Sequence, residues 1–305
     1  MKRNYYHKKD VIYFLEMMDT KQLTDDIVEL IRTAETTLPD DVINALRQAL
    51  KFERGIARIQ IETMLENVRI AKETARPICQ DTGVQTFFVE IGKDFPYSGV
   101  LKPCIVDAVR IATKKIPLRP NTFDPFTREK FQDNIGAHIP AITWDFVEGE
   151  SVMITAIPKG GGSENMSKLV MLKPLQGIEG VKEFVIREIT QAGGNPCPPT
   201  VIGIGVGGGA DLAMKLGKKA LLRPIGLRHP ERNIAEIEKG LIDEINTSGI
   251  GPMGLGGKTT VLDVHIEKAP RHPASLPVGM VVQCWAHRRA KMKIDCNGKC
   301  IQVDQ

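Results

Sequence analysis

The stretch from Arg76 to Ile91, RPICQDTGVQTFFVEI, marks the point at which the character of the sequence changes. Its second half, Val84 to Ile91, is a short run of β-branched and aromatic residues after a glycine, which is typical of a strand. The residues just before this run, Cys79 to Gly83, have the composition of a loop. The sequence therefore predicts an α/β body that begins near residue 76, with a cysteine and polar side chains on the loop before its first strand.

The same kinds of pattern continue beyond this point. Strands that alternate with helices indicate a mixed α/β body, and loops rich in Pro and Gly at strand ends are common places for functional sites. Short apolar runs predict strands at 141–146, 152–157 and 201–206, and helical patterns predict helices at 103–115, 181–192, 211–216 and 234–247. Clusters of Pro and Gly predict loops at 117–125, 159–162, 193–199, 249–257 and 270–277.

The residues before this stretch have a helical pattern instead. Helix starts are expected at Thr24-Asp25-Asp26 and at Pro39-Asp40-Asp41, and a third helix is expected from about Ile56 to Lys72. No internal repeat is evident. The predicted organisation is an N-terminal helical segment (1–75), an α/β body with its candidate site residues on loops (76–290) and a C-terminal tail (291–305).

The composition excludes several classes of protein. The chain has 305 residues, 42% of them hydrophobic, and a net charge of +4 without a long basic run, which argues against nucleic-acid binding. No segment has the ~18 apolar residues of a membrane span, and the apolar stretch Val11–Leu15 is too short for a signal peptide. A cytoplasmic protein is expected. In such a protein the six cysteines favour metal binding or catalysis over disulfides.

Two motifs resemble phosphate-binding loops but are incomplete. Gly203 to Gly208 has the G-x-G-x-x-G spacing, but the region about 20 residues later is neither a strand nor acidic, so a tight glycine turn that allows close backbone approach is preferred. Gly257-Lys258-Thr259 has the end of a Walker A motif, but Pro252 stands where its first glycine should be. Nucleotide binding is therefore not expected.

Three cysteines have unusual surroundings. Cys79 and Cys197 lie in loops rich in Pro or Gly, and Cys284 follows an apolar run; the three are 118 and 87 residues apart. Such wide spacing argues against a zinc knuckle or ferredoxin-type site and suits a site assembled by the fold, although three unrelated buried cysteines would have the same pattern. Three thiolates around a cubane cluster leave one iron open to act as a Lewis acid. Asp81 is placed to move a proton, or to cap a turn.

Several motifs in the same order resemble the class I fumarase and L-tartrate dehydratase family. The resemblance extends from the N-terminal helices to about Arg289, and the tail has little of it. The motifs are Cys79-Gln80-Asp81-Thr82-Gly83, Lys159-Gly160-Gly161-Gly162-Ser163-Glu164-Asn165, Asn195-Pro196-Cys197-Pro198-Pro199, Arg223-Pro224-Ile225-Gly226, Arg271-His272-Pro273 and Cys284-Trp285-Ala286-His287-Arg288-Arg289.

The resemblance implies a cofactor and its ligands. It implies a 4Fe–4S cluster held by Cys79, Cys197 and Cys284, so that residues 76–290 form a cluster-binding body. It also implies that Gln80 and Asp81 border the substrate and that Asp81 takes part in proton transfer.

The resemblance also implies residues that bind the substrate. Arg119 would grip a substrate carboxylate, and Gly161 and Gly162 would bring backbone amides to a carboxylate. His272 would bind substrate or orient Asp81. The alternative for Arg119 is a surface loop cation, and for Gly161 and Gly162 it is a flexible turn. For His272 the alternative is a structural loop histidine.

Four other residues carry weaker expectations. His229, in a similar local sequence to His272, is given less weight. Cys104 is expected in the core. Cys296 and Cys300 are expected to be tail thiols without a role, with metal binding or oxidation as the alternative.

Family members that are complete in one chain carry a second, C-terminal domain. The resemblance thus implies an alpha subunit that needs a separate beta subunit and assembles as a dimer of alpha–beta pairs. The expected activity is hydration of fumarate to malate, with L-tartrate dehydration as the alternative. A hypothesis of another class is a non-catalytic iron–sulfur scaffold or sensor, which would not need Asp81 or Arg119.

Overall fold

The computed structural model describes residues 19–303, which divide into two compact units. The first unit contains the described residues up to Thr37, then 75–158 and the residues from Arg288 onward; the second contains 38–74 and 159–287. The chain therefore passes between the units several times, unlike the predicted consecutive ranges 1–75, 76–290 and 291–305. The stretch Val11–Leu15 lies outside the described residues.

The three predicted N-terminal helices are present: α2 (Thr20–Thr36), α3 (Asp40–Phe52) and α4 (Gly55–Thr74). The helix α2 belongs to the first unit, and α3 and α4 belong to the second. The start of α2 was predicted near Thr24, but Asp19 caps the helix, since its Oδ1 accepts the amides of Lys21 and Gln22, both at 3.0 Å. No helix in the described part of the chain is both long and apolar enough to cross a membrane.

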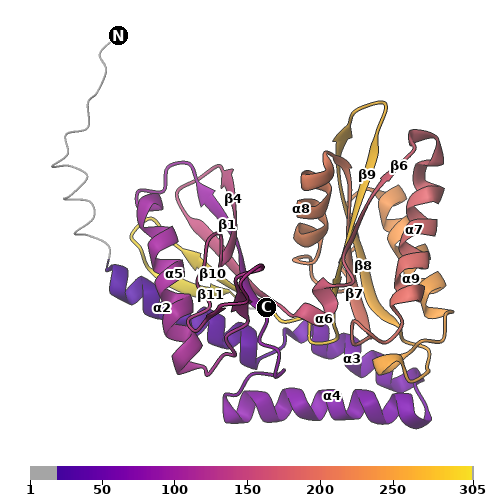
Figure 1. Ribbon diagram of the computed structural model, residues 1–305, viewed down its shortest axis with the longest axis horizontal. Coiled ribbons are helices and arrows are strands. Elements are labelled where there is room, and N and C mark those ends of the chain that lie inside the picture. The colour runs from indigo at the N-terminus through magenta and orange to yellow at the C-terminus, as the bar shows by residue number, and fades with distance from the viewer. Residues whose placement is uncertain (1–18, 304–305) are drawn as a thin grey trace. The chain divides into compact units, whose positions relative to one another are not determined.

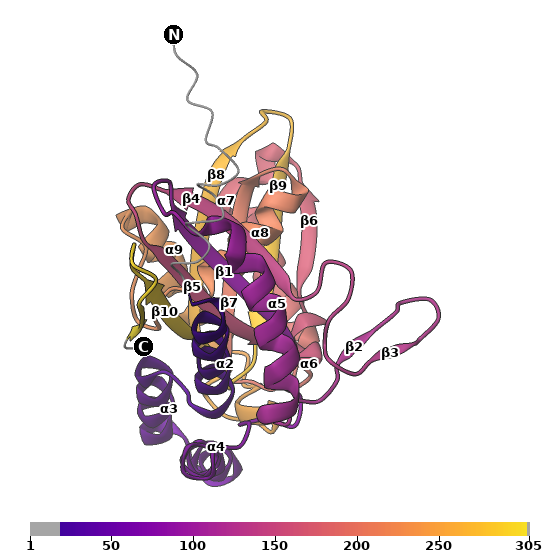
Figure 2. The same cartoon turned by 90° about the vertical axis from the view of Figure 1, so that its left-hand side faces the viewer.

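The first unit is built on a five-stranded mixed sheet, and helices α2 and α5 (Ser98–Lys115) lie beside this sheet (Figure 1). The predicted strands are present as β1 (Val84–Gly92), β4 (Ala141–Val147) and β5 (Val152–Lys159), and β1 and β4 are parallel. The strands β10 (Ala290–Ile294) and β11 (Cys300–Val303) complete the order β11-β10-β5-β1-β4. The segment predicted as a tail therefore supplies two strands. A small hairpin, β2 (Thr122–Phe123) and β3 (Lys130–Phe131), projects from this unit (Figure 2).

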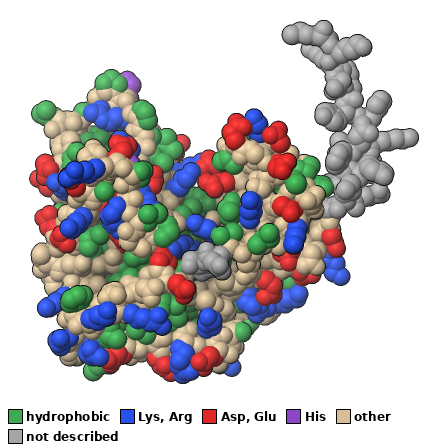
Figure 3. Space-filling view, turned by 180° about the vertical axis from the view of Figure 1, so that it is seen from behind, with side chains coloured by type: hydrophobic (Ala, Val, Ile, Leu, Met, Phe, Trp, Pro, Cys, Tyr) green, Lys and Arg blue, Asp and Glu red, His purple; other side chains and the backbone are tan. Residues whose placement is uncertain are grey.

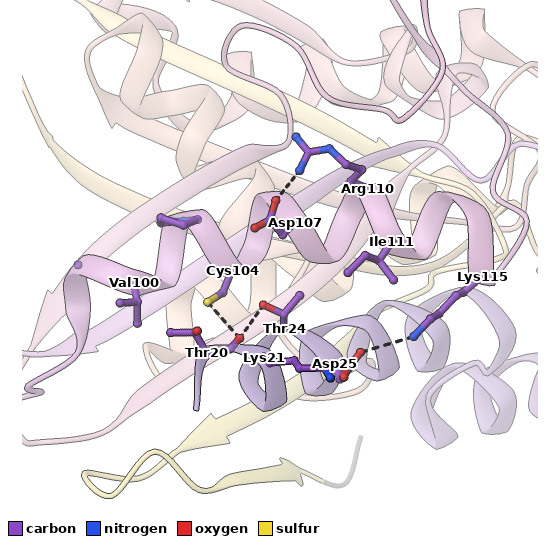
Figure 4. Close-up of a pocket in the computed structure, with 12 residues that line it drawn as sticks. Thr20, Lys21, Thr24, Asp25, Val100, Cys104, Asp107, Arg110, Ile111 and Lys115 are labelled. Carbon is purple, nitrogen blue, oxygen red and sulfur yellow. Dashed lines mark hydrogen bonds and ion pairs between the residues drawn. The ribbon is translucent and has the colours of Figure 1, made fainter. Parts of the chain in front are cut away.

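Helices α2 and α5 pack against each other, and Cys104 lies between them. Its side chain is buried in the core of the first unit and points toward the Thr20 carbonyl oxygen, 3.6 Å from its sulfur (Figure 4). The expectation that Cys104 is a core residue is confirmed. The two helices also border a cavity of about 800 Å³, and two residues that line it, Lys115 and Asp25, form an ion pair (Figure 4).

The second unit is built on a four-stranded sheet of order β6-β9-β7-β8. Helix α8 lies on one face, and α7 and α9 lie on the other (Figure 1). The strands β7 and β8 are parallel, and β9 is antiparallel to β7 and to β6. The elements are α6 (Gly161–Glu164), β6 (Lys168–Leu172), η1 (Pro174–Gln176), α7 (Gly177–Ala192), β7 (Thr200–Gly208), α8 (Ala210–Ala220), α9 (Arg232–Asn246), η2 (Pro252–Gly254), β8 (Val261–Arg271) and β9 (Leu276–Gln283).

The predicted loop at 270–277 is present only at 272–275 and was wrong at both ends, because β8 runs to Arg271 and β9 begins at Leu276. Pro277 suggested a break, yet β7 begins to pair with β9 only at Val278, so the missing amide of Pro277 costs no bond on that side. The charges of the molecule are mixed on its surface: on the face in Figure 3, Lys and Arg side chains alternate with Asp and Glu.

Candidate active site

The Cys79 loop lies in the first unit, directly before β1. Cys79 is half-buried and Gln80 is exposed, while their neighbours Ile78 and Thr82 are buried. The Ile78 amide donates to the carbonyl oxygen of Glu35 at 2.9 Å, which fixes the loop to the end of α2. The loop therefore presents the thiol and the amide side chain from an anchored backbone.

Asp81 is held by two donors in the same loop region. Its Oδ1 accepts the Gly83 amide at 2.9 Å and Asn121 Nδ2 at 3.2 Å. The amide of Arg119 donates to Thr82 Oγ1 at 3.1 Å, so the Arg119 loop lies against the Cys79 loop. The structure thus brings Asp81 and Arg119 together, and it also shows Asp81 in the turn-capping arrangement that the sequence offered as an alternative.

A buried ion pair lies beneath this loop. Arg288 Nη1 donates to Glu35 Oε2 at 2.6 Å, and Arg288 Nη2 donates to the carbonyl oxygen of Asp81 at 3.0 Å. Gln85 Nε2 donates to the other oxygen of Glu35 at 2.7 Å. Burial raises the pKa of Glu35 to about 7, although Arg288 and Gln85 lower it. No role for Glu35 or Arg288 is predicted from the sequence.

The Cys197 loop lies in the second unit, directly before β7. Cys197 is half-buried and has a φ of 55°, a left-handed conformation that is uncommon for a residue with a side chain. Its amide donates to the Gly194 carbonyl oxygen at 3.0 Å, and the Met253 amide donates to the Pro198 carbonyl oxygen at 2.8 Å. The loop is thus closed by its own turn and supported by η2, which holds the unusual backbone in place.

Cys284 follows the last residue of β9 and lies beside the Cys197 loop. The amide of Trp285 donates to the carbonyl oxygen of Cys197 at 3.1 Å, which joins the two loops directly. The glycine loop is also next to them, since a Cβ added to Gly162 would lie 3.6 Å from the Asn195 carbonyl oxygen. Gly161 and Gly162 are both exposed. Two of the predicted ligands and the predicted glycine loop therefore gather in one unit.

Lys159, just before the glycine loop, is a buried cation. It belongs to one of the motifs above, but the sequence predicts no role for it. Its Nζ donates to Val282 O at 2.6 Å and to Ser163 Oγ at 3.0 Å, and lies 3.1 Å from Glu164 Oε2. Burial lowers the pKa of Lys159, and Glu164 and Cys284 oppose that shift. Burial raises the pKa of Glu164, but the ammonium groups of Lys159 and Lys218 lower it overall.

His272 does not share this part of the second unit. It lies exposed in the turn between β8 and β9, where its Nδ1 accepts the Ala274 amide at 3.1 Å. Cys284 follows the other end of β9, an eight-residue strand, so the two residues are separated by roughly 25 Å of extended chain. The hairpin turn accounts for the hydrogen bond of His272, and its expected role in catalysis stays a prediction.

Comparisons with known proteins agree with these motifs. Residues 24–293 match the family model for fumarate hydratase (Fumerase). This chain belongs to the fumarate hydratase family. It is 52% identical over 283 residues to a Methanocaldococcus jannaschii protein named "Putative L(+)-tartrate dehydratase subunit alpha", which covers 91% of this chain and 99% of that protein. It is 38% identical over 275 residues to the "L(+)-tartrate dehydratase subunit alpha" of Escherichia coli K12, covering 90% and 91%. The chain is thus an alpha subunit of this hydro-lyase family.

The donor chemistry of the three cysteines fits an iron–sulfur cluster, because such clusters are held by cysteine thiolates. Among residues 19–303, no three His, Cys, Asp or Glu side chains form a group that would hold one ion. A cubane does not require such a group, because each thiolate binds a different iron. Cys79, Cys197 and Cys284 are all partly exposed and none of them forms a disulfide. Cys300 is less suited, because burial and nearby Asp26 raise the pKa of its thiol to about 12.

Both glycine motifs outside the resemblance have structural explanations in this family member. Gly203 and Gly205 lie inside β7 and not in a turn as expected; a Cβ at either would lie 2.0 Å from a carbonyl oxygen of α8, so they allow the helix to approach the strand. The amides of Lys258 and Thr259 are bound by the Glu53 carboxylate at 2.9 and 2.6 Å. A side chain of the protein thus occupies the amides that a phosphate would need.

The Arg223-Pro224-Ile225-Gly226 motif also has a structural explanation. Arg223 Nη1 binds the buried Glu238 at 2.6 Å and its Nη2 donates to the Ile266 carbonyl oxygen at 2.8 Å. His229 donates its amide to Glu238 Oε2 at 3.0 Å. These contacts attach the segment after α8 to α9 and β8.

Proposed function

We propose that this chain is the cluster-binding alpha subunit of a hydro-lyase that adds water to, or removes it from, a four-carbon dicarboxylic acid. The observation that carries the proposal is the adjacency of two cysteine loops, joined by the Trp285 amide and the Cys197 carbonyl, in a member of this family. Cys284 is the second ligand and Cys79 the third. In the sequence only three residues separate Cys284 from Arg288, whose side chain binds the Asp81 carbonyl in the Cys79 loop.

The proposed cofactor is a 4Fe–4S cluster bound by these three cysteines. When bound, it supplies one iron with an open position, which acts as a Lewis acid on a substrate oxygen. The remaining chemistry falls to side chains of the protein. Asp81 moves the proton on the substrate carbon, since its carboxylate is held in place by the Gly83 amide and Asn121 and stands two residues from Cys79.

The proposed substrate contacts come from exposed groups. The guanidinium of Arg119 binds one carboxylate in a fork, a role supported by the bond from the Arg119 amide to Thr82, the residue after Asp81. The amides of Gly161 and Gly162 bind the other carboxylate, and Gln80 donates from its side-chain amide. Each of these residues is exposed, which suits a site that a second subunit covers.

The proposed partner is a beta subunit that contributes further substrate contacts, in a dimer of alpha–beta pairs. The relatives support this part of the proposal, because they are named as alpha subunits. We expect the lone chain to bind the cluster and to turn over poorly.

The test is an anaerobic reconstitution of the cluster, followed by assays with and without the partner. Fumarate with malate is the first substrate pair, and L-tartrate is the second candidate because the relatives carry that name. We expect turnover of one of them by the two-subunit complex and a large loss in Asp81→Asn. Full activity of the lone chain would exclude the split enzyme. A bound cluster without turnover in any assay would favour the scaffold or sensor.

A further inference from the structure

Lys159 connects two parts of the second unit that flank the candidate site. Its side chain is only 5% exposed, and its ammonium has three partners, one for each of its protons. Two of these, Ser163 Oγ at 3.0 Å and Glu164 Oε2 at 3.1 Å, belong to α6, which begins with the glycine loop. The third, at 2.6 Å, is the carbonyl oxygen of Val282, two residues before Cys284. The ammonium therefore joins the glycine loop to the strand end that carries a cysteine.

The charges around Lys159 do not balance. Glu164 is shared by two ammonium groups, since its Oε1 lies 2.8 Å from Lys218 Nζ and its Oε2 lies 3.1 Å from Lys159 Nζ. These three side chains together carry one surplus positive charge. Lys218 is 32% exposed and Glu164 is 38% exposed, so water screens them, whereas Lys159 is shielded from solvent. Lys159 is therefore the charge of this group that water screens least, and its bond to Val282 O places it near Cys284, two residues further along the chain.

We propose that Lys159 is a positioning residue that fixes the glycine loop against the end of β9 and supplies the positive charge that faces the Cys284 thiolate in the cluster-bound protein. The proposal rests on the proposed cluster binding. It assigns to Lys159 a function that a purely structural lysine would not have. A fixed positive charge near a cluster favours its reduced form, because reduction adds one negative charge.

The test compares the midpoint potential of the reconstituted cluster in four full-length variants. Lys159→Met removes the buried charge, and Lys218→Met is the matched control that removes the same charge from the exposed partner of Glu164. Lys159→Arg keeps the charge with a different shape. Glu164→Gln removes the negative charge that Lys159 and Lys218 share, and so raises the net charge of these three side chains by one. Because the Glu164 side chain is partly exposed, this variant is expected to fold.

We expect Lys159→Met to shift the potential to a more negative value, Lys218→Met to shift it less, Lys159→Arg to restore it and Glu164→Gln to shift it to a more positive value. Equal shifts in Lys159→Met and Lys218→Met, or an unchanged potential in Glu164→Gln, would overturn the inference. If Lys159→Met does not fold, the sign of the shift in Glu164→Gln decides. Failure of the wild-type chain to bind any cluster would overturn the proposed function and this inference together, whereas a wild-type cluster with an unresponsive potential would overturn the inference alone.

Discussion

The buried ion pair between Arg288 and Glu35 gives the most specific prediction about stability. Replacing Arg288 with Met keeps most of the side-chain volume and removes the ion-pair partner of Glu35. Breaking a buried pair in this way typically costs about 3–5 kcal/mol. The Asp81 carbonyl loses its donor as well, at a further cost of about 1–3 kcal/mol. We expect the lower part of the combined range, because Glu35 escapes part of the penalty by taking up a proton.

This proton uptake makes the cost depend on pH. The pKa of Glu35 is about 7 in the folded chain, against an ordinary value of 4.5 for a glutamate side chain. A carboxyl whose pKa is higher in the folded state stabilises the fold at low pH and loses that contribution as pH rises through the folded pKa. For Glu35 this contribution is lost between pH 4.5 and about 7 and amounts to about 3 kcal/mol. Without Arg288, which lowers the pKa, the loss continues to higher pH.

The assay is urea unfolding of the Arg288→Met chain and of the wild type at pH 6 and pH 9. We expect the variant to lose more stability at pH 9 than at pH 6. Arg110→Met is the matched control: Arg110 is 45% exposed and binds acidic side chains on the surface of the same unit, so its loss should cost at most about 1 kcal/mol at either pH. A cost for Arg288→Met that is the same at both pH values, or equal to that of the control, would refute this reasoning.

Three further predictions test other parts of the chain. Gly205→Ala should destabilise the chain by about 1–3 kcal/mol or more, because the added Cβ would lie 2.0 Å from a carbonyl oxygen of α8. Gly240 has open space around it, so Gly240→Ala should raise the melting temperature slightly. Equal changes in melting temperature for the two variants would argue against the close packing at Gly205. Glu53→Gln should cost about 1–3 kcal/mol in urea unfolding, because the carboxylate holds two backbone amides, and an unchanged midpoint would contradict that. After reconstitution, Cys197→Ser should lose most of the visible cluster absorbance and His272→Ala should keep it; a cluster that survives the serine would remove that cysteine from the ligand set.

Some strands could be predicted from the sequence because their burial is continuous. Residues 84–91 are rich in β-branched and aromatic residues, residues 201–206 contain only β-branched residues and glycine, and the two stretches form the interior strands β1 and β7. The strands β8 and β9 were missed because Glu267 and Lys268 interrupt the first and Pro277 lies near the start of the second. Polar and proline residues are tolerated at strand ends, where one neighbouring strand has already stopped pairing, and a local pattern does not contain that information.

The candidate site could be predicted only in part from the sequence, for a different reason. Motifs drew attention to Cys79, Cys197 and Cys284, and the predicted loops around the first two are present as loops. The partners of the supporting charges lie far away along the chain: Glu35 and Arg288 are 253 positions apart. No pattern of nearby residues in the sequence connects such a pair. On its own, Glu35 has the sequence surroundings of a solvated helix end, and Arg288 lies in an ordinary basic segment.

The supporting charges share one physical task. Arg288 binds the carbonyl of Asp81, Lys159 binds the carbonyl of Val282 and Glu53 binds the amides of residues 258 and 259. Asp81 and residues 258 and 259 lie in loops, and Val282 lies in β9 beyond the last residue that pairs with β6. A buried backbone group without a partner is costly. An apolar side chain would fill the same volume but would leave those groups unsatisfied. The buried charges therefore hold the loops in one conformation, and neutral replacements of similar size should disturb loop geometry more than the packing of the core.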